Sequence, residues 1–220
     1  MVEVSTSILS AKREDIAKII YNLEVAKTDY FHIDVMDGKF VKRNTDELMK
    51  EYCGILDNIS NIPKEVHLMV KDVKEYINDY LVYNPNSIIF HLEALDFNEN
   101  EIRSIISYLK ENNVKVGISI KPDTKIEEVY KYLNDVHFVL VMTVEPGEGG
   151  QKLIPETVEK VRILKKYIDR NNLPVDIEVD GGINKETCVE VQEAGANILV
   201  SGSYIVNATD MKEAINYLKY

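Results

Sequence analysis

The fold of this chain is decided by one stretch, Tyr30-Phe31-His32-Ile33-Asp34-Val35-Met36-Asp37-Gly38. Its aromatic and β-branched residues predict a short strand, and an Asp-Gly pair is typical of the turn that ends one. Because side chains alternate across a strand, His32, Asp34 and Met36 share one face, opposite an apolar face. An imidazole and a carboxylate placed in this way more often form a hydrogen-bonded pair, but they also begin a metal or proton-transfer site.

The composition limits the class of protein. The chain has 220 residues, of which 45% are hydrophobic, and this is enough for one large core. The formal net charge of −11 disfavours nucleic acid and anionic membrane surfaces as partners, so an anionic substrate needs local binding groups. Cys53 and Cys188 are far apart and are expected to be free, buried thiols. The absence of a membrane-length apolar run and of an N-terminal targeting pattern predicts a cytoplasmic protein.

Strand and helix patterns alternate along the whole chain. Strands are predicted over residues 2–9, 30–38, 65–70, 87–92, 114–120, 138–144, 176–179 and 198–200. Helices are predicted over 11–26, 45–59, 73–82, 98–112, 124–133, 155–168, 185–194 and 210–218. In the helix over 124–133, Thr124 and Glu127 have the spacing of a capping box.

Eight strand–helix units predict an α/β fold, a (β/α)8 TIM barrel that forms a single domain over residues 1–220. An open, doubly wound sheet is the alternative. It fits less well, because no Gly-x-Gly-x-x-Gly motif follows the first strand.

Chemically able side chains stand at or just past the C-terminal end of every predicted strand. They are Ser7, His32 with Asp34, His67, His91 with Glu93, Lys121, Glu145, Asp180 and Ser203. In a (β/α)8 barrel these ends converge on one face, where active sites form. Two imidazoles and two carboxylates would meet there, from His32, Asp34, His67 and Asp180. Such a set of ligands suits Zn²⁺, Mn²⁺, Co²⁺ or Fe²⁺. A hydrogen-bonded polar core without metal is the alternative.

The remaining charged residues near these ends are expected to be structural. A supporting charge network beneath the site would consist of His91, Glu93, Lys121 and Glu178, since buried charges need partners. His137 precedes a strand and is expected at the surface of the opposite end of the barrel.

Glycine-containing turns follow the last three predicted strands. They are Gly147-Glu148-Gly149-Gly150, Gly181-Gly182 and Gly202-Ser203. Loops after the final strands of such barrels often hold phosphate, and glycine lets backbone N–H groups approach it closely. Backbone donors also bind an anion without a basic surface, which suits an acidic chain. The three turns together predict a phosphate site.

The same strand ends and turns form a recognisable set of motifs. They are Ser7-Ile8-Leu9, His32-Ile33-Asp34-Val35-Met36-Asp37-Gly38, Val66-His67-Leu68-Met69-Val70, Lys121-Pro122, Val141-Met142-Thr143-Val144-Glu145-Pro146-Gly147, Gly149-Gly150-Gln151, Glu178-Val179-Asp180-Gly181-Gly182, Gly195-Ala196-Asn197 and Ser201-Gly202-Ser203. In this order, from Ser7 to about residue 210, the chain resembles the ribulose-phosphate 3-epimerase family.

The resemblance implies an isomerase that interconverts D-ribulose 5-phosphate and D-xylulose 5-phosphate in the pentose phosphate pathway. It implies one divalent metal ion held by His32, Asp34, His67 and Asp180. Asp34 would accept the substrate proton and Asp180 would donate one. Substrate would touch Ser7, His67 and Asp180, with its phosphate side near Gly147, Glu148, Gly149, Gly150, Gly181, Gly182, Gly202 and Ser203. Similar enzymes assemble as dimers or hexamers, so a homo-oligomer is expected.

The chemistry of such a reaction requires the carboxylates and the metal ion that the resemblance implies. To invert a carbon next to a ketone, an enzyme removes its proton from one face and returns a proton to the other. One carboxylate on each face does this without moving the substrate, and a metal ion stabilises the enediolate. Met36, Met69 and Met142 would form an adaptable wall beside that flat intermediate, although plain barrel packing explains them equally well.

Three places in the sequence depart from the family pattern. Thr6 stands where proline is usual, Lys42-Arg43-Asn44 replaces Pro-Asn and an aliphatic residue, and Glu148 replaces phenylalanine in the glycine-rich turn. The last two change charge and shape beside the substrate. Two alternatives therefore stay open: an epimerase for the hexose D-allulose 6-phosphate, and a non-catalytic barrel that binds sugar phosphate.

Overall fold

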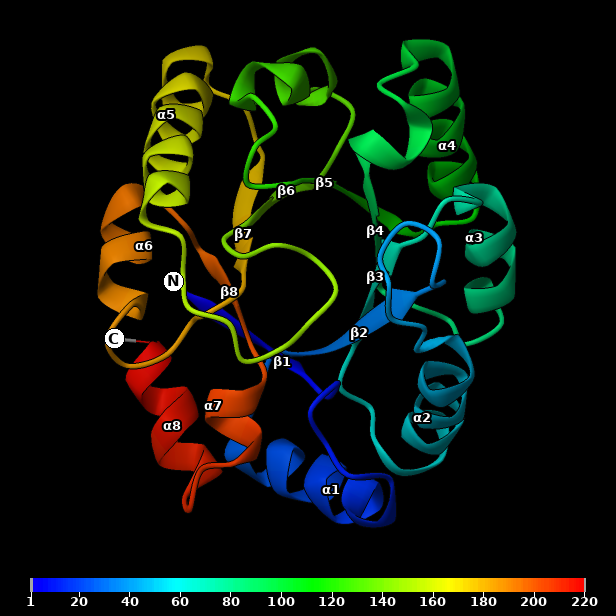
Figure 1. The fold of residues 1–220 in the computed structure, drawn as a ribbon, viewed down its shortest axis with the longest axis vertical. Coiled ribbons are helices and arrows are strands. Elements are labelled where there is room, and N and C mark those ends of the chain that lie inside the picture. Colours follow the sequence, from blue (N-terminus) through cyan, green and yellow to red (C-terminus); the bar gives the residue numbers. More distant parts are fainter. Residues whose placement is uncertain (1, 220) are drawn as a thin grey trace.

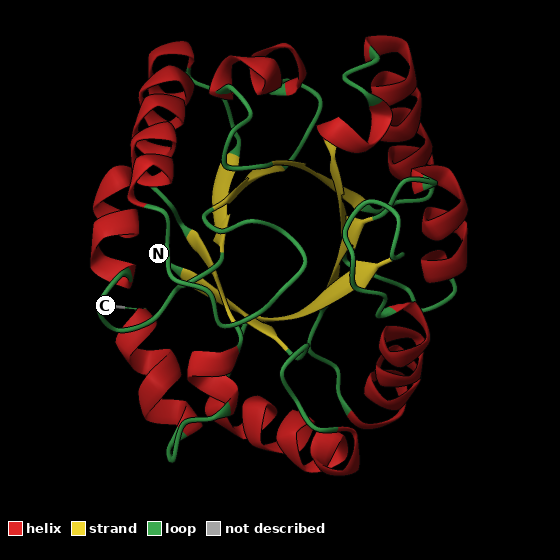
Figure 2. Ribbon diagram, viewed as in Figure 1, coloured by secondary structure: helices red, strands yellow, loops and turns green. Residues whose placement is uncertain are grey.

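Parallel strands pair in chain order, and the last strand pairs with the first, so the sheet closes into a barrel. The computed structural model describes residues 2–219. The strands are β1 (Glu3–Ser7), β2 (Tyr30–Met36), β3 (Lys64–Met69), β4 (Ser87–His91), β5 (Lys115–Ile120), β6 (Phe138–Met142), β7 (Asp176–Asp180) and β8 (Ile198–Ser201). Figure 2 shows them as a ring surrounded by helices. The prediction of a single (β/α)8 barrel is confirmed.

Helices return the chain from the end of one strand to the start of the next (Figure 1). They are α1 (Ile16–Ala26), α2 (Asp46–Ile59), α3 (Val73–Leu81), α4 (Glu99–Glu111), α5 (Pro155–Asn171), α6 (Cys188–Ala194), α7 (Ser203–Val206) and α8 (Met211–Leu218). Short 3₁₀ helices add η1 (Arg13–Asp15), η2 (Leu92–Leu95) and η3 (Ile126–Tyr132). Among the helices of residues 2–219, none combines the length and apolar character that a membrane span requires.

Alternation along the strands divides the apolar side chains into two cores. Phe31, Ile33 and Val35 of β2 belong to the large core between the sheet and the outer helices. A smaller core inside the barrel consists of Ile89, Phe138, Leu140, Met142 and Val144. The polar face of β2 therefore turns inward, as its sequence predicts.

Two predicted details of the helices are wrong. In place of the capped α-helix predicted over residues 124–133, the chain forms the shorter 3₁₀ helix η3 (Ile126–Tyr132), because the Thr124 hydroxyl donates to the Glu93 carboxylate and makes no cap bond. The helix predicted from residue 185 begins only at Cys188, since Asn184 and Thr187 hydrogen-bond with each other in a turn before it. The sequence reasoning also missed η2 and α7, which are only four residues each.

One testable consequence concerns Gly117 of β5, where a Cβ atom would lie 2.4 Å from Phe138 Cε2 and 3.0 Å from Ile89 Cγ1. Gly117→Ala should overpack the inner core and lower the free energy of unfolding by about 1–3 kcal/mol. The matched control is Gly54→Ala in α2, where a Cβ meets nothing within 4 Å. This control should raise stability by about 0.5–1 kcal/mol in denaturant titrations. Equal effects of the two changes would contradict this account of the barrel interior.

Candidate active site

Strands β2, β3 and β7 bring the predicted metal-ligating side chains together at the C-terminal end of the barrel. His32 and Asp34 lie on β2, His67 lies beside Asp34 in register on β3, and Asp180 ends β7. One nitrogen or oxygen atom from each of the four lies within 4.8 Å of the others. Residues far apart in the sequence thus form one cluster of two imidazoles and two carboxylates.

The spacing of these atoms fits a small divalent ion. His32 Nε2 lies 3.3 Å from Asp34 Oδ1, 3.3 Å from His67 Nδ1 and 3.8 Å from Asp180 Oδ2. His67 Nδ1 lies 3.5 Å from Asp34 Oδ1 and 3.6 Å from Asp180 Oδ2. A tetrahedral ion with bonds of about 2.0–2.1 Å keeps its ligand atoms about 3.4 Å apart. The four side chains could therefore hold such an ion with small adjustments.

Burial and neighbouring charge act in opposite directions on the cluster. Burial disfavours the charged imidazole of His32, but the carboxylates of Asp34 and Glu65 raise its pKa well above the usual value. Burial likewise disfavours the Asp34 carboxylate, yet His32 and His67 hold its pKa well below the usual range. The carboxylates of the site thus favour a positive charge beside them. A bound metal ion would supply that charge in place of the imidazole protons that it displaces.

Further carboxylates lie behind His32, away from the other ligating atoms. Glu65 Oε1 lies 2.8 Å from His32 Nδ1 and accepts a hydrogen bond from the Ser5 hydroxyl. Glu178 is fully buried, and within residues 2–219 neither of its carboxyl oxygens has a hydrogen-bond partner. Burial and the nearby Glu65 charge raise the pKa of Glu178 well above its usual value. The sequence reasoning missed Glu65, although its place two residues before His67 puts both on one strand face.

The predicted supporting network lies behind His67. His91 Nε2 is 2.9 Å from His67 Nε2, and His91 Nδ1 is 3.2 Å from Glu93 Oε2. Burial lowers the pKa of His91 to about 4. Lys121 joins the network through its backbone N–H, which donates to Glu93. The Lys121 ammonium lies over the Phe40 ring, 4.2 Å from the centroid, and its charge helps to lower the pKa of His91.

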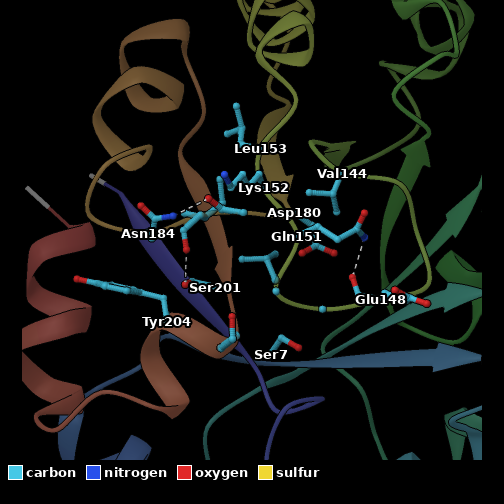
Figure 3. Close-up of a pocket in the computed structure, with 18 of the residues that line it drawn as sticks. Ser7, Val144, Glu148, Gln151, Lys152, Leu153, Asp180, Asn184, Ser201 and Tyr204 are labelled. Atoms are coloured by element: carbon cyan, nitrogen blue, oxygen red, sulfur yellow. Dashed lines mark hydrogen bonds between the residues drawn. The ribbon is translucent and has the colours of Figure 1, made fainter.

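A cavity of about 1210 Å³ opens at this end of the barrel, and Figure 3 shows side chains that line it. Most of the predicted site residues line the cavity, namely Ser7, Asp34, Met36, Met69, Met142, Gly147, Glu148, Gly149, Gly150, Asp180, Gly181, Gly182, Gly202 and Ser203. His32 and His67 are fully buried behind this lining. The Ser7 hydroxyl donates to Asp34 Oδ2 at 2.6 Å and so orients that carboxylate. The sequence reasoning missed Asn184 and Lys185, which the loop after β7 brings to the cavity, and Tyr204, which lies on the short helix α7.

The three glycine-containing turns lie side by side, because β6, β7 and β8 are neighbours in the sheet. Gly182 has a φ of +69°, and a Cβ there would lie 2.4 Å from the Leu153 backbone nitrogen. Only glycine allows this close approach between the loops. Gln151 fixes the turn over residues 147–150 by donating to the Glu145 carbonyl at 2.7 Å and to the Glu148 carbonyl at 2.9 Å. Figure 3 shows the second of these bonds. In Figure 1 the loop between β6 and α5 reaches across the barrel opening.

Comparison with known proteins identifies the chain's relatives. The profile of the Ribulose-phosphate 3 epimerase family matches residues 3–206. This chain belongs to that family. The ribulose-phosphate 3-epimerase of Methanocaldococcus jannaschii is 38% identical over 100% of this chain and 90% of its own length. That of Bacillus subtilis is 36% identical over 100% of this chain and 99% of its own length. The chain is therefore an isomerase of the epimerase type.

Solved structures share the barrel at much lower sequence identity. KGPDC of Streptococcus mutans has a TM-score of 0.69 and 10% identity. The superposition covers 100% of this chain and 96% of that one. This likeness shows the fold alone. The family membership of this epimerase rests on its sequence relatives.

The departures from the family pattern fall into two kinds. Thr6 is buried away from the cavity, where its hydroxyl shares a hydrogen bond of 2.7 Å with Thr28. Arg43 and Glu148 both line the cavity and are exposed to solvent. The epimerase therefore carries one extra positive and one extra negative side chain at the cavity, beside the predicted substrate position.

A test of the cluster follows from the burial of His67. His67→Ala removes one of four candidate ligands, so the purified chain should contain less Zn²⁺, Mn²⁺, Co²⁺ or Fe²⁺ per molecule. Elemental analysis measures this content. The matched control is His137→Ala, because His137 is exposed and precedes β6 at the opposite end. Equal metal content in both variants, or full activity in a verified metal-free preparation, would favour a hydrogen-bonded polar cluster without metal.

Proposed function

We propose that this chain is a metal-dependent enzyme that inverts C3 of a ketose phosphate and interconverts D-ribulose 5-phosphate and D-xylulose 5-phosphate. The observation that carries this proposal is the convergence of Asp34 and Asp180 on one cavity beside two buried imidazoles. The printed names of the relatives support the choice of substrate. The pentose phosphate pathway in the cytoplasm is the proposed setting.

The proposed reaction is a proton transfer between two carboxylates. Asp34 accepts the proton of C3, and the electrons of the broken C–H bond form an enediolate with the neighbouring carbonyl. Asp180 then donates a proton to the opposite face of C3. Two observations support these roles: Ser7 orients the Asp34 carboxylate, and the Asp180 side chain is 17% exposed. Contact with water lets Asp180 take up a new proton between turnovers, and the buried Asp34 would release its proton into the cavity that it lines.

Several groups would support this chemistry. One divalent ion, Zn²⁺, Mn²⁺, Co²⁺ or Fe²⁺, would supply positive charge where negative charge develops on the substrate. Its proposed ligands are His32, Asp34, His67 and Asp180. Met36, Met69 and Met142 line the same cavity and would pack against the flat intermediate.

The glycine-containing turns are the proposed phosphate site. They bear neighbouring backbone N–H groups on the β6–β8 side of the cavity, with Ser7 beside Gly202. A Cβ at Gly202 would lie 3.2 Å from the Ser7 Cβ, so glycine keeps β1 and the last turn in close contact. Assembly into a dimer or hexamer stays a prediction, which light scattering can check.

Two alternatives can be tested in one common experiment, because Arg43 and Glu148 alter the charge at the cavity. A coupled assay should show turnover of D-ribulose 5-phosphate, with a higher kcat/KM than for D-allulose 6-phosphate. Preference for the hexose would identify the second sugar as substrate. Tight binding of D-ribulose 5-phosphate without epimerisation would identify a non-catalytic barrel.

The two-carboxylate mechanism makes a sharper prediction for single variants. Epimerisation needs both groups, so Asp34→Asn and Asp180→Asn should each lower it by at least ~10². Exchange of the C3 proton with solvent needs only one. In heavy water, Asp180→Asn should deuterate C3 of the epimer that Asp34 deprotonates, with retained configuration, and Asp34→Asn should do so only for the other epimer.

The control for this experiment is the metal content of each variant, because both aspartates are also proposed ligands. Only preparations with metal equal to the unmodified chain are compared by NMR. A metal-replete single variant that exchanges C3 of both epimers at the same rate would show that the carboxylates do not serve opposite faces.

A further inference from the structure

A row of side chains behind His67 leads away from the cavity. His67 Nε2 lies 2.9 Å from His91 Nε2, and His91 Nδ1 lies 3.2 Å from Glu93 Oε2. Both imidazoles are fully buried, and the Glu93 side chain is 13% exposed. The Phe40 ring covers His91 at a centroid distance of 5.0 Å. Because water has little access, the hydrogen bonds of these groups must be satisfied within the protein.

The second oxygen of Glu93 is fixed by a single loop. Glu93 Oε1 accepts hydrogen bonds from the Lys121 backbone N–H, at 2.8 Å, and from the Thr124 hydroxyl. The ammonium group of Lys160 on α5 donates to the carbonyls of Lys121, Pro122 and Thr124 and so anchors this loop. The backbone N–H can only donate. The carboxyl group of Glu93 must therefore present an acceptor at Oε1.

The directions of the remaining hydrogen bonds follow from the chemistry of imidazole. The carboxylate accepts at Oε2, so His91 Nδ1 carries a hydrogen and donates it. A neutral imidazole has one N–H, which makes His91 Nε2 an acceptor. The contact at 2.9 Å is then a hydrogen bond only if His67 donates from Nε2. When the His67 ring is neutral, as metal binding requires, its lone pair is then left on Nδ1, the atom that faces Asp34 and Asp180.

We propose that Glu93 and His91 are positioning residues, which fix His67 in the tautomer that presents the Nδ1 lone pair to the metal site. This inference rests on the metal-holding role proposed above, and it names the groups that prepare one ligand. Glu65 has the same relation to His32, because it lies 2.8 Å from Nδ1 and leaves Nε2 facing the cluster. Outer partners of this kind typically change metal affinity by about 10–100-fold when they are removed.

Glu93→Gln tests the row with little change of shape. Lys121 N–H still needs an acceptor, so the new amide oxygen faces the loop and the amide NH₂ faces His91. His91 must then accept at Nδ1 and donate from Nε2, which moves the hydrogen of His67 onto Nδ1. The affinity for Zn²⁺, measured by competition with a chelator, should fall by about 10–100-fold. Glu111→Gln is the matched control, because Glu111 is exposed at the end of α4, and its Zn²⁺ affinity should be unchanged.

A second measurement needs no variant. The chain has only 4 histidines, so ¹⁵N NMR of the metal-free protein, at a pH at which the rings are neutral, can assign the tautomer of each ring. The metal-free sample is the informative one, because Zn²⁺ bound at Nδ1 would by itself force the His67 hydrogen onto Nε2. His91 should carry its hydrogen on Nδ1 and His67 on Nε2. If Glu93 and His91 do not set the tautomer, a neutral, metal-free His67 should carry its hydrogen on Nδ1, toward the carboxylates of Asp34 and Asp180. This measurement decides the question even if Glu93→Gln fails to fold.

The outcomes separate this inference from the proposed function. Failure of the unmodified chain to bind Zn²⁺ would show that the proposed metal site is wrong. Binding by the unmodified chain, together with equal affinity in Glu93→Gln or with His91 protonated on Nε2, would overturn the positioning role alone.

Discussion

Closure of the parallel sheet is the constraint on which the site depends. In a closed barrel, the inward-facing side chains at the C-terminal ends of the strands all point toward the barrel axis. Register places Asp34 next to His67 on adjacent strands, and Asp180 reaches the same point from β7. The two carboxylates thus approach one cavity from different strands. This geometry supports the proposed arrangement, in which each carboxylate serves one face of a small substrate.

Burial of the charged cluster lowers the stability of the fold, and the placement of each imidazole beside carboxylates partly offsets this cost. Moving carboxylates out of water is costly, and a buried ionic group seldom stabilises a fold more than apolar packing of the same volume would. Here each imidazole lies between carboxylates: His32 between Asp34 and Glu65, and His67 beside Asp34 and Asp180. Glu178 is buried without a hydrogen-bond partner within residues 2–219, which also costs free energy. These residues are better explained by the chemistry of the site than by the stability of the barrel.

The features predicted correctly are those that the local order of apolar and polar residues determines. The alternation of YFHIDVM predicted which face of β2 turns inward, and the eight strand–helix units predicted the barrel. The start of η3 could not be predicted, because Thr124 bonds Glu93, 31 residues earlier, in preference to its own helix. The contact of Lys121 with Phe40 likewise depends on tertiary neighbours. Asn184 reaches the cavity from a turn and Tyr204 from the four-residue helix α7, and both segments are too short to show a sequence period that predicts side-chain direction. Glu65 could have been found from strand alternation alone.

The central claim is that Asp34 and Asp180 act on opposite faces of the substrate, and the fate of one proton tests it most directly. The unmodified enzyme would convert D-ribulose 5-phosphate in heavy water, and mass spectrometry and NMR would follow the first-formed D-xylulose 5-phosphate. With two carboxylates, the acid that protonates C3 has taken its hydrogen from solvent, so the first product should carry deuterium at C3 almost completely. Substantial return of the substrate's own hydrogen to C3 would mean that one group serves both faces, and would contradict this account.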